Sequence, residues 1–108
     1  MTWEAVHIAM MFVEERYEIK WQSIYGAYGA YLRWTKSALR VVIYATAMVY
    51  GTEPAAAMLN IPIDIIESTL HRTYFILRKD KELKANYMLL RKRLIEHKNM
   101  GKTINYES

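Results

Sequence analysis

The chain of 108 residues contains no cysteine, which excludes disulfide bonds, thiol catalysis and cysteine zinc sites. Proline occurs only twice and glycine only four times, so few residues interrupt regular structure. Between these breakers apolar residues recur at spacings of three and four. No stretch alternates apolar and polar residues as a half-buried strand does. The sequence therefore predicts an all-α fold, a compact helical bundle.

A long apolar run is also missing. The longest, Val41 to Tyr50 with Thr46 inside it, is about half of the ~20 residues that span a bilayer. The first residues lack the basic segment and apolar stretch of a signal peptide. We therefore expect a cytoplasmic protein with no membrane partner. Because 53% of the residues are hydrophobic, the chain should fold, and its length suits a single domain over residues 1–108.

Positive charge increases along the chain. Residues 1–34 carry three Lys or Arg and four Asp or Glu, residues 35–79 carry five and three, and residues 80–108 carry seven and four. The net charge of +4 is thus concentrated toward the C-terminus. This distribution suits a polyanionic partner, although a solvated basic face produces the same pattern.

Aromatic side chains are frequent in the N-terminal third. A helix is expected to begin near Thr2, and segment 25–34, YGAYGAYLRW, either continues it or bends at Gly26. We favour a bend or a short second helix there. The apolar stripe of this region is interpreted as core and dimer interface, in preference to a ligand pocket. The residues assigned to oligomerisation are Trp3, Met10, Tyr17, Trp21, Ile24 and Tyr28.

Further helices are expected beyond residue 35. Gly51 should stop the first of them, and Thr52 should cap the next, with Pro54 in its first turn. Gly101 should end the last, a basic helix, and leave residues 100–108 as a polar tail. The expected helices cover about 38–50, 53–59, 63–79 and 81–99.

The segment 52–78 has the spacing of a helix-turn-helix. This motif needs a small residue where two helices cross, a tight turn four residues later, and buried apolar residues beyond it. Ala56 and Asn60 meet the first two needs, because Asn tolerates the left-handed backbone of such a turn. The sequence therefore predicts a helix-turn-helix core over residues 36–79. The apolar residues expected to be buried beside the turn are Leu59, Ile61, Ile66 and Leu70.

The run NIPIDIIESTLHRTYFILRK resembles the end of region 4 in extracytoplasmic-function sigma factors, where runs close to IPxGTVKSRLHRARxxLR are typical. The preceding RVVIYATAMVYGTEPAAAML is similar to the earlier helices of that module, so residues 39–79 are covered. Many small phage regulators carry the same module. The 38 residues before it are too few for the promoter-melting region 2, so a complete sigma factor is not expected. The resemblance carries Ser68, His71 and Arg72 over as candidate DNA contacts.

The chain departs from the sigma pattern by acidic residues. Glu67 stands where the family has a basic residue, and Asp64 adds a second acid on the same face. A carboxylate can accept a hydrogen bond from cytosine but is repelled by phosphates. The predicted DNA-binding residues are Thr52, Ile63, Asp64, Glu67, Ser68, His71, Arg72, Arg78 and Lys79, and the candidate phosphate contacts are Arg91, Lys92 and Arg93.

Catalytic and metal-binding patterns are not found in the sequence. The three histidines, at 7, 71 and 97, are scattered, and no carboxylate lies at helical ligand spacing to more than one of them. Asp64 and Glu67 have no nucleophile placed beside them, so a solvated helix face explains them best. We expect neither an enzyme nor a cofactor, metal or small-molecule substrate.

Two functions from different classes follow. The first is a small DNA-binding transcriptional regulator, encoded by a phage or mobile element, that binds duplex DNA as a dimer. The alternative is a protein-interaction module that keeps the fold without reading bases and binds RNA polymerase, another partner or another copy of the chain. It would use the face formed by Ile63, Asp64, Ile65 and Glu67. Within the DNA class, a small terminase-like packaging subunit would instead form a ring larger than a dimer.

Overall fold

The structure, a computed structural model, describes the backbone of residues 2–17 and 36–107. These residues form five helices and contain no strand, which confirms the predicted all-α fold. The expected bend at Gly26 lies outside the described residues, as do Trp21, Ile24 and Tyr28 of the predicted oligomerisation stripe. The helices are α1 (Thr2–Tyr17), α3 (Lys36–Tyr50), α4 (Thr52–Leu59), α5 (Ile63–Leu77) and α6 (Lys81–Glu107).

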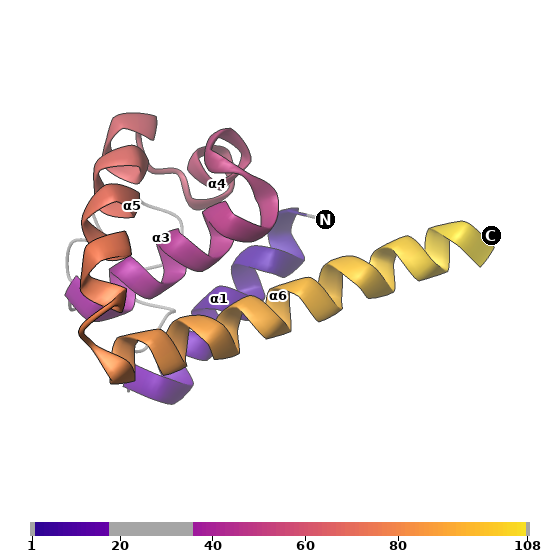
Figure 1. Ribbon diagram of the computed structural model, residues 1–108. Coiled ribbons are helices and arrows are strands. Elements are labelled where there is room, and N and C mark those ends of the chain that lie inside the picture. Colours follow the sequence, from indigo (N-terminus) through magenta and orange to yellow (C-terminus); the bar gives the residue numbers. More distant parts are fainter. Residues whose placement is uncertain (1, 18–35, 108) are drawn as a thin grey trace.

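Helix α3 lies at the centre of the bundle and contacts each of the other four helices (Figure 1). Helices α4 and α5 lie on one side of it, whereas α1 and α6 run beside each other on the other (Figure 1). This position explains the longest apolar run of the sequence, because all residues from 41 to 47 are buried. A helix that is surrounded must be apolar on every side.

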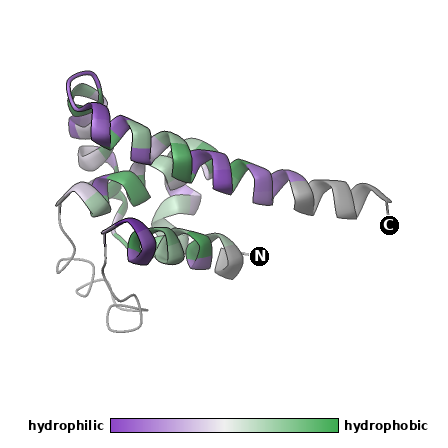
Figure 2. Ribbon diagram, turned by 90° about the horizontal axis from the view of Figure 1, so that it is seen from below, coloured by the Kyte–Doolittle hydropathy of each residue, from purple (hydrophilic) through white to green (hydrophobic). Residues whose placement is uncertain are grey.

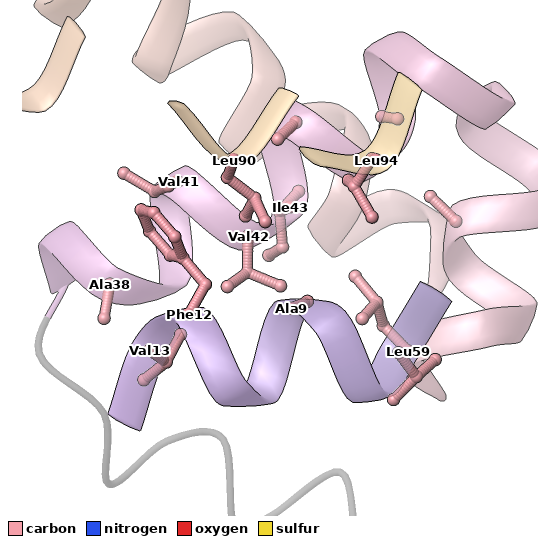
Figure 3. Packing of buried hydrophobic residues seen from close by; sticks show 14 of the residues in the cluster. Ala9, Phe12, Val13, Ala38, Val41, Val42, Ile43, Leu59, Leu90 and Leu94 are labelled. Carbon is pink, nitrogen blue, oxygen red and sulfur yellow. The ribbon is translucent and has the colours of Figure 1, made fainter. Parts of the chain in front are cut away.

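The largest part of the core is built where α1, α3 and α6 meet (Figure 3). Phe12 of α1, Val42 of α3 and Leu90 of α6 have no exposed surface. Hydrophilic and hydrophobic bands follow one another along α6, and its far end extends beyond the rest of the bundle (Figures 1 and 2). Leu83 and Leu94 of α6 are also buried, so one face of this basic helix is apolar and packs on the core.

Polar contacts attach α1 to α6. Asn86 of α6 is only 4% exposed, and its side-chain oxygen accepts hydrogen bonds from Nε and Nη2 of Arg16 at 3.1 and 2.7 Å. The Asn86 amide donates to the hydroxyl of Tyr17 at 3.0 Å. Two turns further along α6, Arg93 forms a two-bond ion pair with Glu15, at 3.1 and 3.3 Å. These contacts join residues about 70 to 78 positions apart, so they fix α1 against the C-terminal helix.

Three predicted helix boundaries were wrong. Gly51, with φ 101°, is the N-cap of α4, and Thr52 is the first helical residue rather than the cap. Only one residue separates α3 from α4, so Gly51 must both end the first helix and cap the second. Helix α5 ends at Leu77, two residues before the expected Lys79. Helix α6 continues through Gly101 to Glu107, because glycine inside a helix costs only about 1 kcal/mol and does not by itself end it.

Candidate nucleic-acid interface

The connection between α4 and α5 is a three-residue turn with a fixed backbone. Asn60 adopts the left-handed conformation, with φ 55° and ψ 47°, as the sequence predicted. The backbone N–H groups of Asn60 and Ile61 both donate to the carbonyl of Ala56, and Ile61 is 3% exposed. The carbonyl of Pro62 accepts from the N–H groups of Ile65 and Ile66 at 3.1 Å. The turn thus closes one helix, buries its central residue and starts the next.

Helix α5 is strongly two-sided. Ile66 and Thr73 have no exposed surface, and Leu70 and Leu77 are half-buried on the same stripe. These four positions follow the spacing of 4, 3 and 4 that marks one face of a helix. Because Leu59 of α4 is fully buried as well, the two helices are held to α3 as one unit.

The opposite side of α5 carries most of the predicted DNA-binding residues. Of these, Thr52 is half-buried at the start of α4, and the other eight are exposed. The hydroxyl of Ser68 donates to the backbone carbonyl of Ile65 at 3.1 Å, so its hydrogen is already used within the helix. The eight exposed residues are Ile63, Asp64, Glu67, Ser68, His71, Arg72, Arg78 and Lys79.

Charge is unevenly distributed along this exposed side. Asp64 and Glu67 lie in the first two turns of α5, whereas Arg72 lies in its second half and Arg78 and Lys79 directly follow its last residue. None of these five charged groups forms an ion pair with another residue in the described part of the chain. The acidic and basic ends of α5 are therefore separate, and an anionic ligand is favoured only at the basic end.

Two exposed aromatic residues at the basic end were missed by the sequence analysis. Tyr74 is 54% and Phe75 is 51% exposed. The Phe75 ring contacts the rings of His71 and Tyr74 edge to face, with centroids 5.3 Å apart in both pairs. Phe75 could have been found from its spacing, because it does not lie on the buried stripe of α5 that the core requires. An aromatic residue there is not needed for the core.

The candidate phosphate contacts on α6 have mixed surroundings. Lys92 is exposed and Arg91 half-buried, and both line an open apolar groove of about 540 Å³ with Met88, Leu89 and Ile95. The guanidinium of Arg93 is directed at α1 instead, where it lies 5.4 Å from the centroid of the Phe12 ring. Its hydrogen bond and its charge lower the pKa of Glu15. A phosphate would have to displace that carboxylate from Arg93.

The predicted oligomerisation residues have different environments. Met10 has no exposed surface, so it belongs to the core part of that interpretation and not to a surface between copies. Tyr17 is half-buried and its hydroxyl is bound by Asn86. Burial raises the pKa of Tyr17 above its usual value, more than the bond from Asn86 lowers it. Trp3 lies within α1.

Other kinds of site were sought in the described residues as well. No group of three or more His, Asp or Glu residues in residues 2–17 and 36–107 is arranged to hold a metal ion. Within the same ranges, none of the helices combines the length and the apolar character needed to cross a membrane. Comparisons with protein-family models, with curated proteins and with solved structures found no match to the chain.

Proposed function

We propose that this protein is a small transcriptional regulator, encoded by a phage or mobile element, that binds duplex DNA through α4, the turn and α5. The observation that carries the proposal is that α5 is buried along one side and exposed along the other. Its buried stripe is fixed to the bundle, and its other side exposes Asp64 and Glu67 in the first two turns and polar, basic and aromatic residues after them. A helix that enters the major groove needs this combination, because it must be held rigidly from behind and be open in front.

In this mode Arg72, Arg78 and Lys79 would bind the phosphate backbone, with Ser68 and His71 nearer the bases. Each phosphate contact releases a condensed counterion, so binding should weaken steeply with salt. Fluorescence anisotropy of a labelled random-sequence duplex, at about 50 and about 200 mM salt, measures this directly. Affinity that falls by orders of magnitude between the two conditions supports the proposal, whereas no binding at the lower salt contradicts it.

Two single variants identify the helix that contacts DNA. Arg72→Ala should weaken binding to all sequences and reduce the slope of log affinity against log salt by about 1. Lys92→Ala removes another exposed cation, from α6, and serves as the matched comparison. A change with Lys92→Ala alone would move the DNA surface from α5 to α6. Unchanged binding of Arg72→Ala contradicts docking through α5.

A second candidate function is favoured by the first turn of α5. Ile63 is 41% exposed beside the exposed carboxylates of Asp64 and Glu67. An apolar residue flanked by acids suits a protein surface better than a phosphate backbone. Replacing Ile63 and Glu67 together should then abolish capture of RNA polymerase, or self-association, while DNA affinity stays equal or increases. Loss of DNA affinity in this double variant would favour base reading by the same turn.

A further inference from the structure

Phe75 has cationic and imidazole residues at the helical spacings nearest to it in the sequence. The positions that neighbour it on a helix are three and four residues away in each direction. They are occupied by His71 and Arg72 within α5 and by Arg78 and Lys79 in the turn that follows Leu77, and all four are exposed. An apolar ring that is 51% exposed thus has two arginines, one lysine and one histidine at these spacings, and the histidine, His71, contacts the ring.

The Phe75 ring is also held in place. The rings of His71 and Tyr74 contact it at 5.3 Å between centroids, with interplanar angles of 79° and 83°. Edge-to-face contacts of this kind are favourable and restrict the ring. About half of the Phe75 surface nevertheless stays in contact with solvent. The ring is therefore ordered before any ligand arrives, which lowers the entropy cost of binding to it.

The charges near Phe75 limit the kinds of ligand that this site can bind. A polyanion without rings would use the three cations but leave Phe75 in water, and an apolar protein surface would bury Phe75 but also desolvate the cations. Glu67, the nearer acid of α5, lies eight residues or about two turns before Phe75, but only four residues before His71. The carboxylate of Asp80 accepts the Leu83 N–H as a cap of α6. A ligand that suits the whole cluster combines flat rings with a chain of negative charges.

We propose that this cluster binds an unstacked base of single-stranded nucleic acid. Phe75 would stack on the base, and Arg72, Arg78 and Lys79 would bind the phosphates on either side. Single strands offer free base faces, which a continuous duplex hides within its stack, and proteins bind them with aromatic rings inside a basic surface. This inference rests on the proposed function, since it accepts nucleic acid as the ligand and specifies the form that this end of α5 recognises.

Three labelled ligands of equal length test the inference by fluorescence anisotropy at about 50 mM salt. They are an oligothymidylate of about 12 nucleotides, a duplex of the same length, and a strand of abasic sites with the same phosphates. The whole protein should bind the oligothymidylate more tightly than the abasic strand. Phe75→Ala should weaken oligothymidylate binding roughly 5- to 150-fold, the effect of losing one stacked base, and leave abasic binding unchanged.

Further variants separate stacking from general apolar contact. Phe75→Leu keeps much of the volume without the π-face and should weaken oligothymidylate binding as Phe75→Ala does, whereas Phe75→Trp should preserve it. Met11→Ala removes an apolar side chain of similar exposure, 46%, from α1 and should change none of the three affinities. Far-UV circular dichroism of each variant checks that the helices are retained. Wild-type affinity of Phe75→Leu for the oligothymidylate would overturn stacking.

The outcomes distinguish this inference from the proposed function. If the protein binds duplex DNA but binds oligothymidylate no better than the abasic strand, the inference is wrong and duplex binding remains. If Phe75→Ala weakens binding of the oligothymidylate and the duplex equally, the ring serves duplex binding and the inference is again overturned. If none of the three ligands binds, both fail together.

Discussion

Asn86 offers the sharpest test of how the bundle is held together. It is the most connected polar side chain of the described core, accepting two hydrogen bonds from Arg16 and donating one to Tyr17. We expect Asn86→Ala to lower the free energy of unfolding by about 2 kcal/mol. A net hydrogen bond contributes about 0.5–1.5 kcal/mol, and one to a charged group contributes more. Two considerations make the loss smaller than the sum of the three hydrogen-bond contributions.

The first is that Arg16 is exposed and can regain water when Asn86 is removed. Its contribution therefore lies at the low end of the range for charged groups. The second is that alanine has a higher helix propensity than asparagine, by roughly 0.5 kcal/mol. In the other direction, the hydroxyl of the half-buried Tyr17 loses its donor, and the small buried side chain leaves unfilled space. These terms together give the figure of about 2 kcal/mol.

Urea denaturation followed by far-UV circular dichroism measures this loss, and the midpoint of thermal unfolding should fall by roughly 8 °C. A double-mutant cycle with Arg16→Ala isolates the pair and should give a coupling energy of about 1 kcal/mol. The reasoning is refuted if Asn86→Ala costs less than about 0.5 kcal/mol, or if the two substitutions are strictly additive.

Three further predictions concern the turn, the core and the response to pH. Asn60→Gly should leave the free energy of unfolding within about 0.5 kcal/mol, whereas Asn60→Val should lower it by about 1–2 kcal/mol in urea denaturation, because a β-branched residue resists the left-handed backbone. Thr73→Val should raise it by about 1 kcal/mol, since the fully buried Thr73 hydroxyl has no hydrogen-bond partner among the described residues; Thr73→Ser, which keeps the hydroxyl, should not. Burial raises the pKa of Tyr44 and Tyr87 above the usual value of about 10, so their contribution to stability is complete below that pH and is lost as pH rises through the folded-state pKa. Thermal unfolding at rising alkaline pH should show this loss, and Tyr44→Phe should reduce it.

The helical framework could be predicted from the sequence where a pattern has only one physical solution. The spacing of four, three and four residues in Leu83, Tyr87, Leu90 and Leu94 can bury a single face only in a helix, and the three leucines are buried. The turn at Asn60 was predictable for the same reason, since few residues accept its left-handed backbone.

Helix ends were less predictable because two neighbouring residues can each satisfy the same requirement. Gly51 and Thr52 both suit an N-cap, and the choice depends on how α3 and α4 pack, which needs positive φ at the linking residue. The ring cluster around Phe75 was missed for a different reason. The resemblance drew attention to the residues that match a known spacing, and Tyr74 and Phe75 fall between them. Their exposure becomes evident only when the buried side of α5 is known.

The separation of charge along α5 has a consequence for the way an anion approaches. Glu67 and Arg78 are eleven residues apart, or about 17 Å along the helix. That distance is about twice the screening length of roughly 8 Å at physiological ionic strength. At that ionic strength Arg78 and Lys79 are largely screened from Glu67, whereas Arg72, only five residues or about 8 Å along the helix from Glu67, is not. A phosphate chain therefore meets the least opposed attraction at Arg78 and Lys79. In dilute salt the same helix acts as an extended dipole, which would turn an incoming strand toward Arg78 before any contact is made.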